Sequence, residues 1–331
     1  MREIIPIFLS SDENYAPYVA TTIASIVRHT EAMVQFYVLD GGIHEESRNK
    51  LQDLVNAKEN ASIEFIDMSF AQLGKFPDLR HYSVNTFSRY FIPQLKKDLG
   101  KVLYLDVDIL VLGDIAELYR QSPGDYPVAA VLEDFHGVNG AHLAEVWHEF
   151  TDVPHYFNAG VLLLDIAWFR AHNITELLVA KTNDMQSILS CADQDVLNAF
   201  FQKNFQTLDY RFNCMPDLKK YMLESSHTAA LAALEDPLII HYVAQKPWKT
   251  HLAPHWEKFI EVAKQTPFYD KIQENFRNSI LGKNGSLRKL QIRKIRYQIL
   301  SQLCLGKKRR TYNEKYLALQ KSISALNYLS T

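Results

Sequence analysis

Residues 101–113 read Lys-Val-Leu-Tyr-Leu-Asp-Val-Asp-Ile-Leu-Val-Leu-Gly, an apolar run of strand type that contains two aspartates. Because successive strand side chains point to opposite faces, we expect Asp106 and Asp108 to point to the same side. Two carboxylates at a strand end form an oxygen site that suits a divalent cation carrying phosphates. In open α/β sheets, ligands bind at the carboxyl ends of the strands. The alternative for an isolated Asp-x-Asp is an Asx-rich turn after a strand.

Around this stretch, the first 135 residues alternate strand-like and helix-like segments. The predicted strands are 4–9, 34–39, 63–66, 102–105 and 128–132, and the predicted helices cover 17–27, 45–57 and 85–97. This rhythm predicts a mostly parallel sheet with helices on both faces. The second half is less regular, with strands expected at 161–164 and 238–240 and a helix at 193–202 that is capped by Asp193.

The charges divide the chain into two parts. Of its 331 residues, 47% are hydrophobic and 22% charged, which is typical of a globular protein with a large core. Residues 283–315 contain eleven Lys or Arg and one acid, whereas residues 1–282 contain 24 Lys or Arg and 37 Asp or Glu. We therefore predict an acidic domain at 1–282 and, after a linker at 282–286, a basic helical C-terminal segment at 283–331.

The basic segment has an amphipathic pattern. Four apolar residues share one helical face, and the Lys and Arg residues lie mostly off it; the four are Ile292, Ile295, Ile299 and Leu303. Such a helix is typical of association with an anionic membrane surface, here through residues 283–315. The alternative is a charged helix that packs on the main domain through its apolar stripe. Nucleic acid is not expected as a partner, because the acidic domain would repel it.

Cysteine usage and hydropathy bear on the compartment. The three cysteines show no C-x-x-C spacing, which argues against a disulfide framework and favours a reducing compartment. The N-terminal apolar run at 4–9 is too short for a signal peptide, and no run of 18 apolar residues occurs. We expect a cytoplasmic protein that is peripheral on the inner face of the membrane.

Three further segments carry candidate chemistry. Residues 10–15 follow the first strand and open a helix, a position where α/β proteins bind nucleotides. Residues 193–195 read Asp-Gln-Asp at a helix start. His241 follows a short strand as a candidate third metal ligand, and Lys246 follows as a point charge for a phosphate. The dinucleotide fingerprint and the phosphate loop are both missing from the sequence, so neither of those folds is supported.

Together these segments resemble glycosyltransferase family 8, with particular similarity to bacterial lipooligosaccharide galactosyl- and glucosyltransferases. The matching motifs, in chain order, are Asp12-x-Asn14-Tyr15, Tyr104-Leu105-Asp106-Val107-Asp108, Phe157-Asn158-Ala159-Gly160-Val161, Asp193-Gln194-Asp195 and His241-Tyr242 followed by Lys246-Pro247-Trp248. The resemblance spans residues 1–255. It implies a retaining enzyme of GT-A fold, a Rossmann-like α/β sheet flanked by helices, that uses a UDP-sugar donor and Mn²⁺, with Mg²⁺ as the alternative.

The resemblance also implies a role for each matching residue. Asp106, Asp108 and His241 would ligate the metal, and an imidazole among oxygens fits Mn²⁺ better than Mg²⁺. The implied donor-binding residues are Asp12, Asn14, Tyr82, Arg89, Asp106, Val107, Asn158, Gly160, Asp193, Gln194 and Lys246. The implied catalytic residues are Gln194, Asp193 and Lys246. Because an amide is a poor nucleophile, we favour front-face substitution over double displacement, with Lys246 neutralising the departing phosphate.

The expected function is transfer of galactose or glucose from a UDP-sugar to a surface-glycan acceptor such as lipooligosaccharide. A self-glucosylating glycogenin-like primer enzyme is one alternative, and a non-catalytic nucleotide-sugar-binding or scaffold protein is another. The chain departs from the family pattern at Val243-Ala244-Gln245, which is one residue shorter than the usual turn and has no glycine. After the strand at 128–132, the choice between Glu133 and Asp134 as the functional acid stays open.

Overall fold

The structure is a computed structural model that describes residues 4–68, 84–133, 135, 138–282 and 285–329. Its contacts divide the chain into two compact units, Met1–His241 and Tyr242–Thr331. The second unit groups residues 242–282 with the basic segment, whereas we expected a boundary at 282. The assignment of a catalytic domain to residues 1–282 stays a prediction, and each unit is described by itself below.

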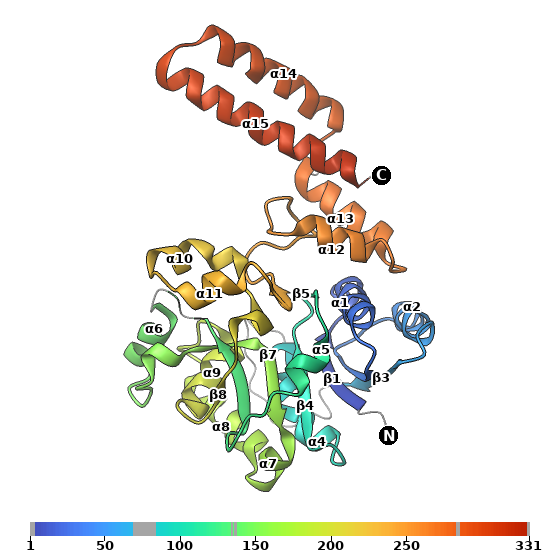
Figure 1. Cartoon of the computed structure of the whole chain (residues 1–331), viewed down its shortest axis with the longest axis vertical. Coiled ribbons are helices and arrows are strands. Elements are labelled where there is room, and N and C mark those ends of the chain that lie inside the picture. Colours follow the sequence, from blue (N-terminus) through green and yellow to red (C-terminus); the bar gives the residue numbers. More distant parts are fainter. Residues whose placement is uncertain (1–3, 69–83, 134, 136–137, 283–284, 330–331) are drawn as a thin grey trace. The chain divides into compact units, whose positions relative to one another are not determined.

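The first unit is built on a seven-stranded sheet with the order β3-β2-β1-β4-β7-β6-β8 (Figure 1). Its strands are β1 (Ile4–Ser11), β2 (Met33–Asp40), β3 (Ala61–Asp67), β4 (Lys101–Leu105), β6 (Val128–Leu132), β7 (Phe157–Asp165) and β8 (Gln206–Thr207). The first four of these strands pair in parallel, and β7 runs antiparallel to both β4 and β6. The predicted mostly parallel sheet is therefore confirmed, with one antiparallel strand in its interior.

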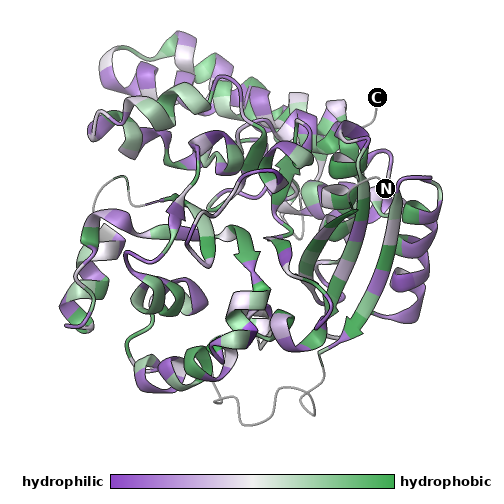
Figure 2. Cartoon of the chain, turned by 60° about the horizontal axis from the view of Figure 1, so that its bottom comes forward, coloured by the Kyte–Doolittle hydropathy of each residue, from purple (hydrophilic) through white to green (hydrophobic). Residues whose placement is uncertain are grey.

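Apolar strands and amphipathic helices build the core of this unit (Figure 2). The α-helices are α1 (Ala16–His29), α2 (Glu45–Asn56), α4 (Ile92–Leu95), α5 (Ile115–Tyr119), α6 (Val138–Val146), α7 (Ile166–Ala171), α8 (Ile174–Met185), α9 (Ala192–Phe201), α10 (Lys219–Glu224) and α11 (Thr228–Ala233). Phe8, Tyr104 and Leu162 pair across three adjacent strands and share one buried cluster with Val196 and Leu197 of α9. These contacts pack α9 against the sheet, and α9 carries the candidate site residues Asp193 and Gln194.

The predicted helix at 85–97 differs from the structure. A 3-10 helix, η1 (Val84–Phe91), is followed by the four-residue α4 (Ile92–Leu95). Proline has no backbone N–H, so Pro93 cannot donate to the carbonyl of Arg89 four residues earlier, as a continuous α-helix would require. The segment therefore changes helix type one turn after it has placed Arg89 at the sheet.

A small second sheet brings a distant segment to the end of β4. Strand β5 (Ile109–Val111) pairs antiparallel with β9 (Ile239–His241), and Ile109 lies opposite His241. The strand predicted at 238–240 is thus confirmed with a shift of one residue. Because β5 begins directly after Asp108, this pairing carries His241 to the aspartate pair.

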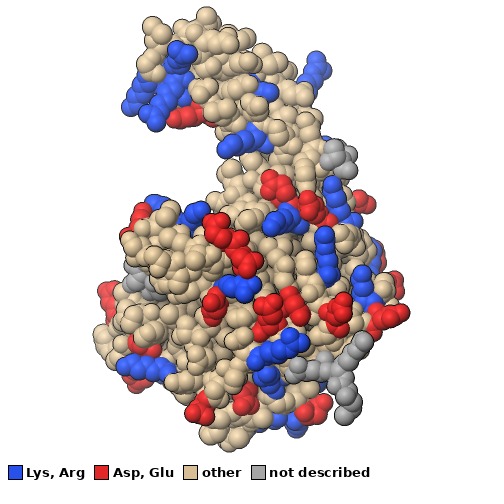
Figure 3. All heavy atoms as spheres, in the orientation of Figure 1, with Lys and Arg blue, Asp and Glu red and all other residues tan. Residues whose placement is uncertain are grey.

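The second unit contains α12 (Trp256–Ala263), α13 (Tyr269–Leu281), α14 (Leu287–Leu303) and α15 (Gly306–Tyr328). Helices α14 and α15 pack together through a cluster that includes Leu290, Ile323 and Leu326. The predicted apolar stripe lies on another face of α14, and its four side chains are 50–76% exposed. Helices α14 and α15 form a helical hairpin, called the basic hairpin below, on which Lys and Arg gather (Figure 3). Among the described helices, none combines the length and apolar character needed to cross a bilayer.

Candidate active site

Asp106, Asp108 and His241 meet in one cluster. The two aspartates lie in the bend between β4 and β5, and His241 ends β9. The Nε2 atom of His241 lies 3.3 Å from Asp108 Oδ1 and 4.0 Å from Asp106 Oδ2. One potential ligand atom from each residue lies within 4.8 Å of the other two. Two carboxylates and an imidazole at this spacing form a donor set that fits a divalent transition metal such as Mn²⁺.

Gly160 on β7 makes room for this cluster. Its carbonyl accepts a hydrogen bond of 2.7 Å from the backbone N–H of Asp106, so the two strands are in close contact here. A Cβ atom at position 160 would lie 2.3 Å from Cε1 of His241 and 2.7 Å from Oδ2 of Asp106. Only glycine therefore fits beneath the two candidate ligands, because any side chain would displace one of them.

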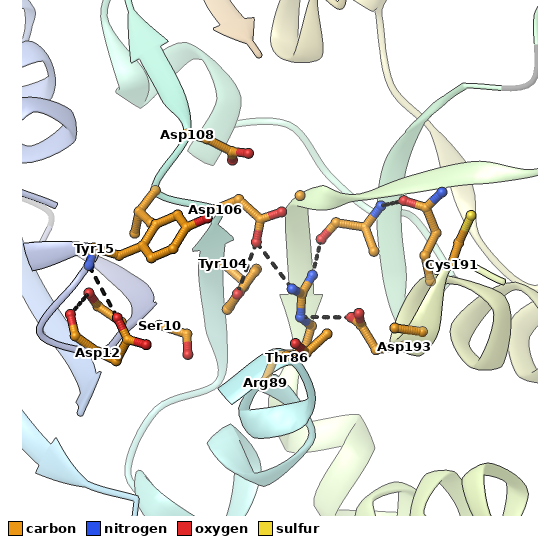
Figure 4. A pocket seen from close by; sticks show the side chains of 16 residues that line it. Ser10, Asp12, Tyr15, Thr86, Arg89, Tyr104, Asp106, Asp108, Cys191 and Asp193 are labelled. Carbon is orange, nitrogen blue, oxygen red and sulfur yellow. Dashed lines mark hydrogen bonds and ion pairs between the residues drawn. The ribbon is translucent and has the colours of Figure 1, made fainter. Parts of the chain in front are cut away.

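The guanidinium of Arg89 holds two carboxylates on opposite sides. It lies 3.1 Å from Asp106 Oδ1 and 2.9 Å from Asp193 Oδ2, and it also donates to the carbonyl of Ala159 (Figure 4). The Tyr104 ring lies 4.0 Å beneath it, and the Tyr104 hydroxyl donates to Asp106 Oδ1 at 3.0 Å. With Oδ1 of Asp106 held by two donors, its Oδ2 is the oxygen left facing His241.

Burial shapes the protonation of this ion pair. It is the largest influence on Arg89 and lowers its pKa, but the combined effect of Asp193, Tyr104, Asp106 and Tyr90 outweighs burial, so the pKa lies above its ordinary value. Burial also raises the pKa of Asp193 to about 7, and Arg89 only partly offsets the shift.

The predicted N-cap role of Asp193 is wrong. The cap residue of α9 is Cys191, and the Asp195 carboxylate accepts from the N–H groups of Ser190 and Cys191 at 2.7 Å each. Asp193 instead pairs with Arg89.

A hydrogen-bonded set of side chains lies beside Gly160. Glu133 Oε2 accepts from the amides of Asn158 and Gln194, each at 2.8 Å. Asn158 Oδ1 accepts from Asn213 at 2.8 Å, and Asn213 Oδ1 lies 3.0 Å from Nδ1 of His241. Between the two acids left open by the sequence, Glu133 belongs to this set, and Asp134 lies outside the described residues.

These residues border a pocket of about 490 Å³ in the first unit. It is lined by Ser10, Ser11, Asp12, Tyr15, Thr86, Arg89, Tyr104, Asp106, Val107, Asp108, Ala159, Gly160, Cys191, Ala192, Asp193 and Gln194. Eight residues predicted for the site are among them. The carboxylate of Asp12 accepts from the N–H groups of Asn14 and Tyr15 at 2.9 and 3.1 Å, which orders the start of α1.

Four predicted residues that the structure describes are not in the pocket lining. Asn14 is exposed. Asn158 and His241 are buried, and each contacts a lining residue, Asn158 with Gln194 and His241 with Asp108. Lys246 belongs to the second unit, where its ammonium donates to the carbonyl of Tyr242. Tyr82 lies outside the described residues.

Sequence reasoning missed several residues of the site. They are Thr86 and Cys191 of the pocket lining, together with the buried Asn213. Five further lining residues lie in the segments or motifs singled out from the sequence but were given no individual role there; they are Ser10, Ser11, Tyr15, Tyr104 and Ala159. Tyr104 had a signal, because it lies two residues before Asp106 on the same face of the strand. Asn213 had no sequence signal, because it lies outside every motif quoted above. The structure places it at the end of a short 3-10 helix, η3 (Tyr210–Asn213).

Comparison with known proteins identifies relatives of the whole first unit. The family described as "Glycosyl transferase family 8" matches residues 6–251. General stress protein A of Bacillus subtilis is 30% identical over 260 residues, 75% of this chain and 89% of the relative. The lipopolysaccharide 1,3-galactosyltransferase of Salmonella typhimurium is 25% identical over 270 residues, 78% of this chain and 77% of the relative.

A solved structure shares the architecture as well. The galactosyltransferase LgtC, in complex with donor and acceptor sugar analogues, superposes with a TM-score of 0.69 at 28% identity, over 80% of this chain and 96% of LgtC. The region that matches the family, residues 6–251, contains every motif on which the sequence resemblance rests. It ends before the hairpin of α14 and α15. The chain therefore belongs to glycosyltransferase family 8 and has the GT-A fold.

Proposed function

We propose that this glycosyltransferase transfers a hexose, galactose or glucose, from a UDP-sugar to a surface-glycan acceptor such as lipooligosaccharide, with Mn²⁺ and with retention of the anomeric configuration. The observation that carries the proposal is the Asp106, Asp108 and His241 cluster at the edge of a pocket of about 490 Å³. A pocket of this volume accommodates a ligand of nucleotide-sugar size. The similarity to a lipopolysaccharide galactosyltransferase supports the acceptor class and favours galactose.

The donor would lie along the pocket from β1 to α9. Asp12 and Asn14, with Tyr82 and the backbone of Val107, would hold the uridine near the start of α1. Asp106, Asp108 and His241 would hold Mn²⁺, which when bound supplies positive charge to the diphosphate and so stabilises the leaving group. The residues Arg89, Asn158, Gly160, Asp193 and Gln194 would surround the sugar.

The contacts of Gln194 favour front-face substitution. Its Oε1 accepts from the N–H of Ala159 at 2.9 Å and from Asn158 at 3.2 Å, and its NH₂ donates to Glu133. An amide held at both ends is poorly suited to attack a sugar carbon, whereas a double displacement requires a free carboxylate. In the proposed reaction the departing phosphate takes the acceptor proton, and Lys246 neutralises the charge that develops on it.

The basic hairpin would hold the enzyme at its acceptor. The exposed side chains of Ile292, Ile295 and Ile299 and the Lys and Arg residues of 283–315 provide the apolar and cationic contacts of an interfacial helix. An anionic membrane surface contributes on the order of 1 kcal/mol per basic residue close to it. A lipid-linked acceptor would then be presented in the same interface.

A donor screen tests the central proposal. UDP release is measured with UDP-galactose, UDP-glucose and other UDP-sugars, in Mn²⁺ and after EDTA. We expect turnover with a UDP-hexose, loss of activity in EDTA, and better recovery with Mn²⁺ than with Ca²⁺. Asp108→Asn should reduce turnover by at least about 10²-fold, as for other lost transition-state stabilisers. Full activity in EDTA would refute the metal assignment.

Intact-mass measurement after incubation with UDP-glucose and Mn²⁺ separates the alternatives. A mass increase in multiples of a hexose would favour the self-glucosylating primer enzyme. Donor binding without UDP release, in the presence of lipooligosaccharide, would favour the non-catalytic binding protein. Release of UDP with an unchanged protein mass supports the proposed function.

A further inference from the structure

Two backbone N–H groups determine how the amide side chains of the site are oriented. The N–H of Gly160 donates to Asn158 Oδ1 at 2.9 Å, and the N–H of Ala159 donates to Gln194 Oε1 at 2.9 Å. A backbone N–H can only donate, so the side-chain atom that faces it must be the amide oxygen. The orientation of an amide is ordinarily assigned from its hydrogen-bond network. Here both orientations follow from fixed main-chain donors.

The orientation of Asn158 determines the proton position on His241 through Asn213. Because Asn158 presents its oxygen, the Asn213 group at 2.8 Å must be the NH₂, which turns Asn213 Oδ1 towards Nδ1 of His241 at 3.0 Å. An amide oxygen can only accept, so Nδ1 carries the proton. In the neutral ring the lone pair is then on Nε2, the atom that faces Asp106 and Asp108.

Asn213 is itself held rigidly. Its side chain is fully buried, and both ends of its amide have partners. The next residue, Cys214, makes two backbone hydrogen bonds with β9. Its N–H donates to the carbonyl of Ile239 at 2.8 Å, and its carbonyl accepts from the N–H of His241 at 2.7 Å. Asn213 is therefore fastened to the strand that carries the histidine.

We propose that Asn213 is a positioning residue for the metal site, which rests on the proposed function of that site. It holds His241 in the tautomer whose Nε2 can bind Mn²⁺, and it links the metal ligand through Asn158 to Gln194 and Glu133. Metal-binding histidines generally donate their other N–H to a fixed acceptor, and loss of such a partner weakens metal affinity by about 10- to 100-fold. The same amide chain contacts Gln194, which would face the donor sugar, through the hydrogen bond from Asn158.

Two substitutions separate the roles of the two ends of Asn213. Asn213→Ala removes both hydrogen bonds, so Mn²⁺ affinity without donor should fall by about 10- to 100-fold. Asn213→Asp keeps an acceptor for His241 but loses the donor to Asn158. Its Mn²⁺ affinity should stay near the wild-type value, while kcat falls because a carboxylate oxygen would then face Asn158 Oδ1, and the repulsion between them would displace Asn158 and the Gln194 amide bonded to it. Calorimetric titration with Mn²⁺ and steady-state kinetics measure the two effects.

Asn60→Ala provides a matched control. The Asn60 amide donates to the carbonyls of Thr30 and Ala32 at 3.0 and 3.1 Å, at a distance from the pocket lining. This variant should lose stability but keep its Mn²⁺ affinity. If Asn213→Ala lost stability and likewise kept the affinity, Asn213 would be a structural residue only and the proposal would be overturned.

The tautomer of His241 gives a readout that needs neither metal nor donor. Long-range ¹⁵N correlation spectra of histidine-labelled, metal-free protein should show His241, assigned by its absence in His241→Ala, protonated at Nδ1. Asn213→Asp should preserve this state and Asn213→Ala should lose it. A wild-type ring protonated at Nε2 alone would refute the proposal. If the wild-type protein bound no Mn²⁺, the proposed function of the metal site would fail, while the tautomer would still report on Asn213.

Discussion

Gly160→Ala tests the packing beneath the proposed metal site. The added Cβ would lie 2.3 Å from Cε1 of His241, 2.7 Å from Asp106 Oδ2 and 3.1 Å from Asn158 Oδ1. Carbon atoms in contact are separated by at least about 3.5 Å, so the ring or the strand must move by about 1.2 Å. Metal sites tolerate deviations of about 0.2 Å in ligand distance. The substitution should therefore remove His241 from productive ligation.

The expected effect is larger on metal binding than on folding. Overpacking in a dense interior costs about 1–3 kcal/mol of unfolding free energy, which a domain of this size tolerates. We expect Mn²⁺ affinity to fall by at least about tenfold, equivalent to about 1.4 kcal/mol of binding free energy. Electron paramagnetic resonance of free Mn²⁺ measures the affinity, and urea unfolding measures the stability.

Gly100→Ala is the control for this experiment. A Cβ atom there meets nothing within 4 Å, so both stability and Mn²⁺ affinity should stay near wild type. A folded Gly160→Ala protein that binds Mn²⁺ with unchanged affinity would refute the reasoning, because it would place the metal elsewhere or allow His241 to move without loss.

Four other outcomes follow from the site and the hairpin. Gln194→Ala should slow transfer without a trapped glycosyl-enzyme, and NMR should find the product in the donor's α configuration; a β-linked product would contradict front-face substitution. The folded-state pKa of Asp193, about 7, lies above its ordinary value of 3.8, so the stability it contributes is complete below pH 4 and is lost as the pH rises through 7. The free energy of unfolding in urea should accordingly differ less between pH 5 and pH 8 in Asp193→Asn than in the wild-type protein. An equal difference in the two proteins would exclude this titration. Burial raises the pKa of the Cys191 thiol to about 11, so iodoacetamide at pH 7.5 should leave Cys191 unmodified, as peptide mapping would show. Replacing the exposed Ile295 and Ile299 by serine should weaken sedimentation with anionic vesicles, whereas Leu177→Ser in the first unit should not; equal sedimentation of all three proteins would remove the membrane proposal.

The sequence alone determined those features that depend on neighbouring residues. The apolar run at 102–105 and the spacing of Asp106 and Asp108 predict a strand that ends in two carboxylates on one side, because strand side chains alternate with a period of two. The row of exposed isoleucines on α14 is likewise visible in their spacing along the sequence. The ordered motifs were sufficient to indicate the family and the candidate metal ligands.

Local patterns failed where a residue had several possible partners. Asp193 has the sequence context of an N-cap, yet its carboxylate pairs with Arg89 from a segment 104 positions earlier in the chain. The helix expected at 85–97 changes type between Phe91 and Ile92, next to Pro93, and that break lies close to Arg89, which holds both carboxylates. A local pattern reports a propensity, whereas burial beside a charged partner decides the contact that forms.

Only the tertiary structure decided how the distant segments meet. Strand β7 runs antiparallel between β4 and β6, which places Gly160 beneath His241 and Asp106. Pairing of β5 with β9 brings position 241 beside position 109, and η3 places Asn213 between His241 and Asn158. These contacts join residues tens to more than a hundred positions apart, and no periodicity in the chain encodes them. They arise because a close-packed interior leaves space for one arrangement of side chains, and each buried polar group in it requires a partner.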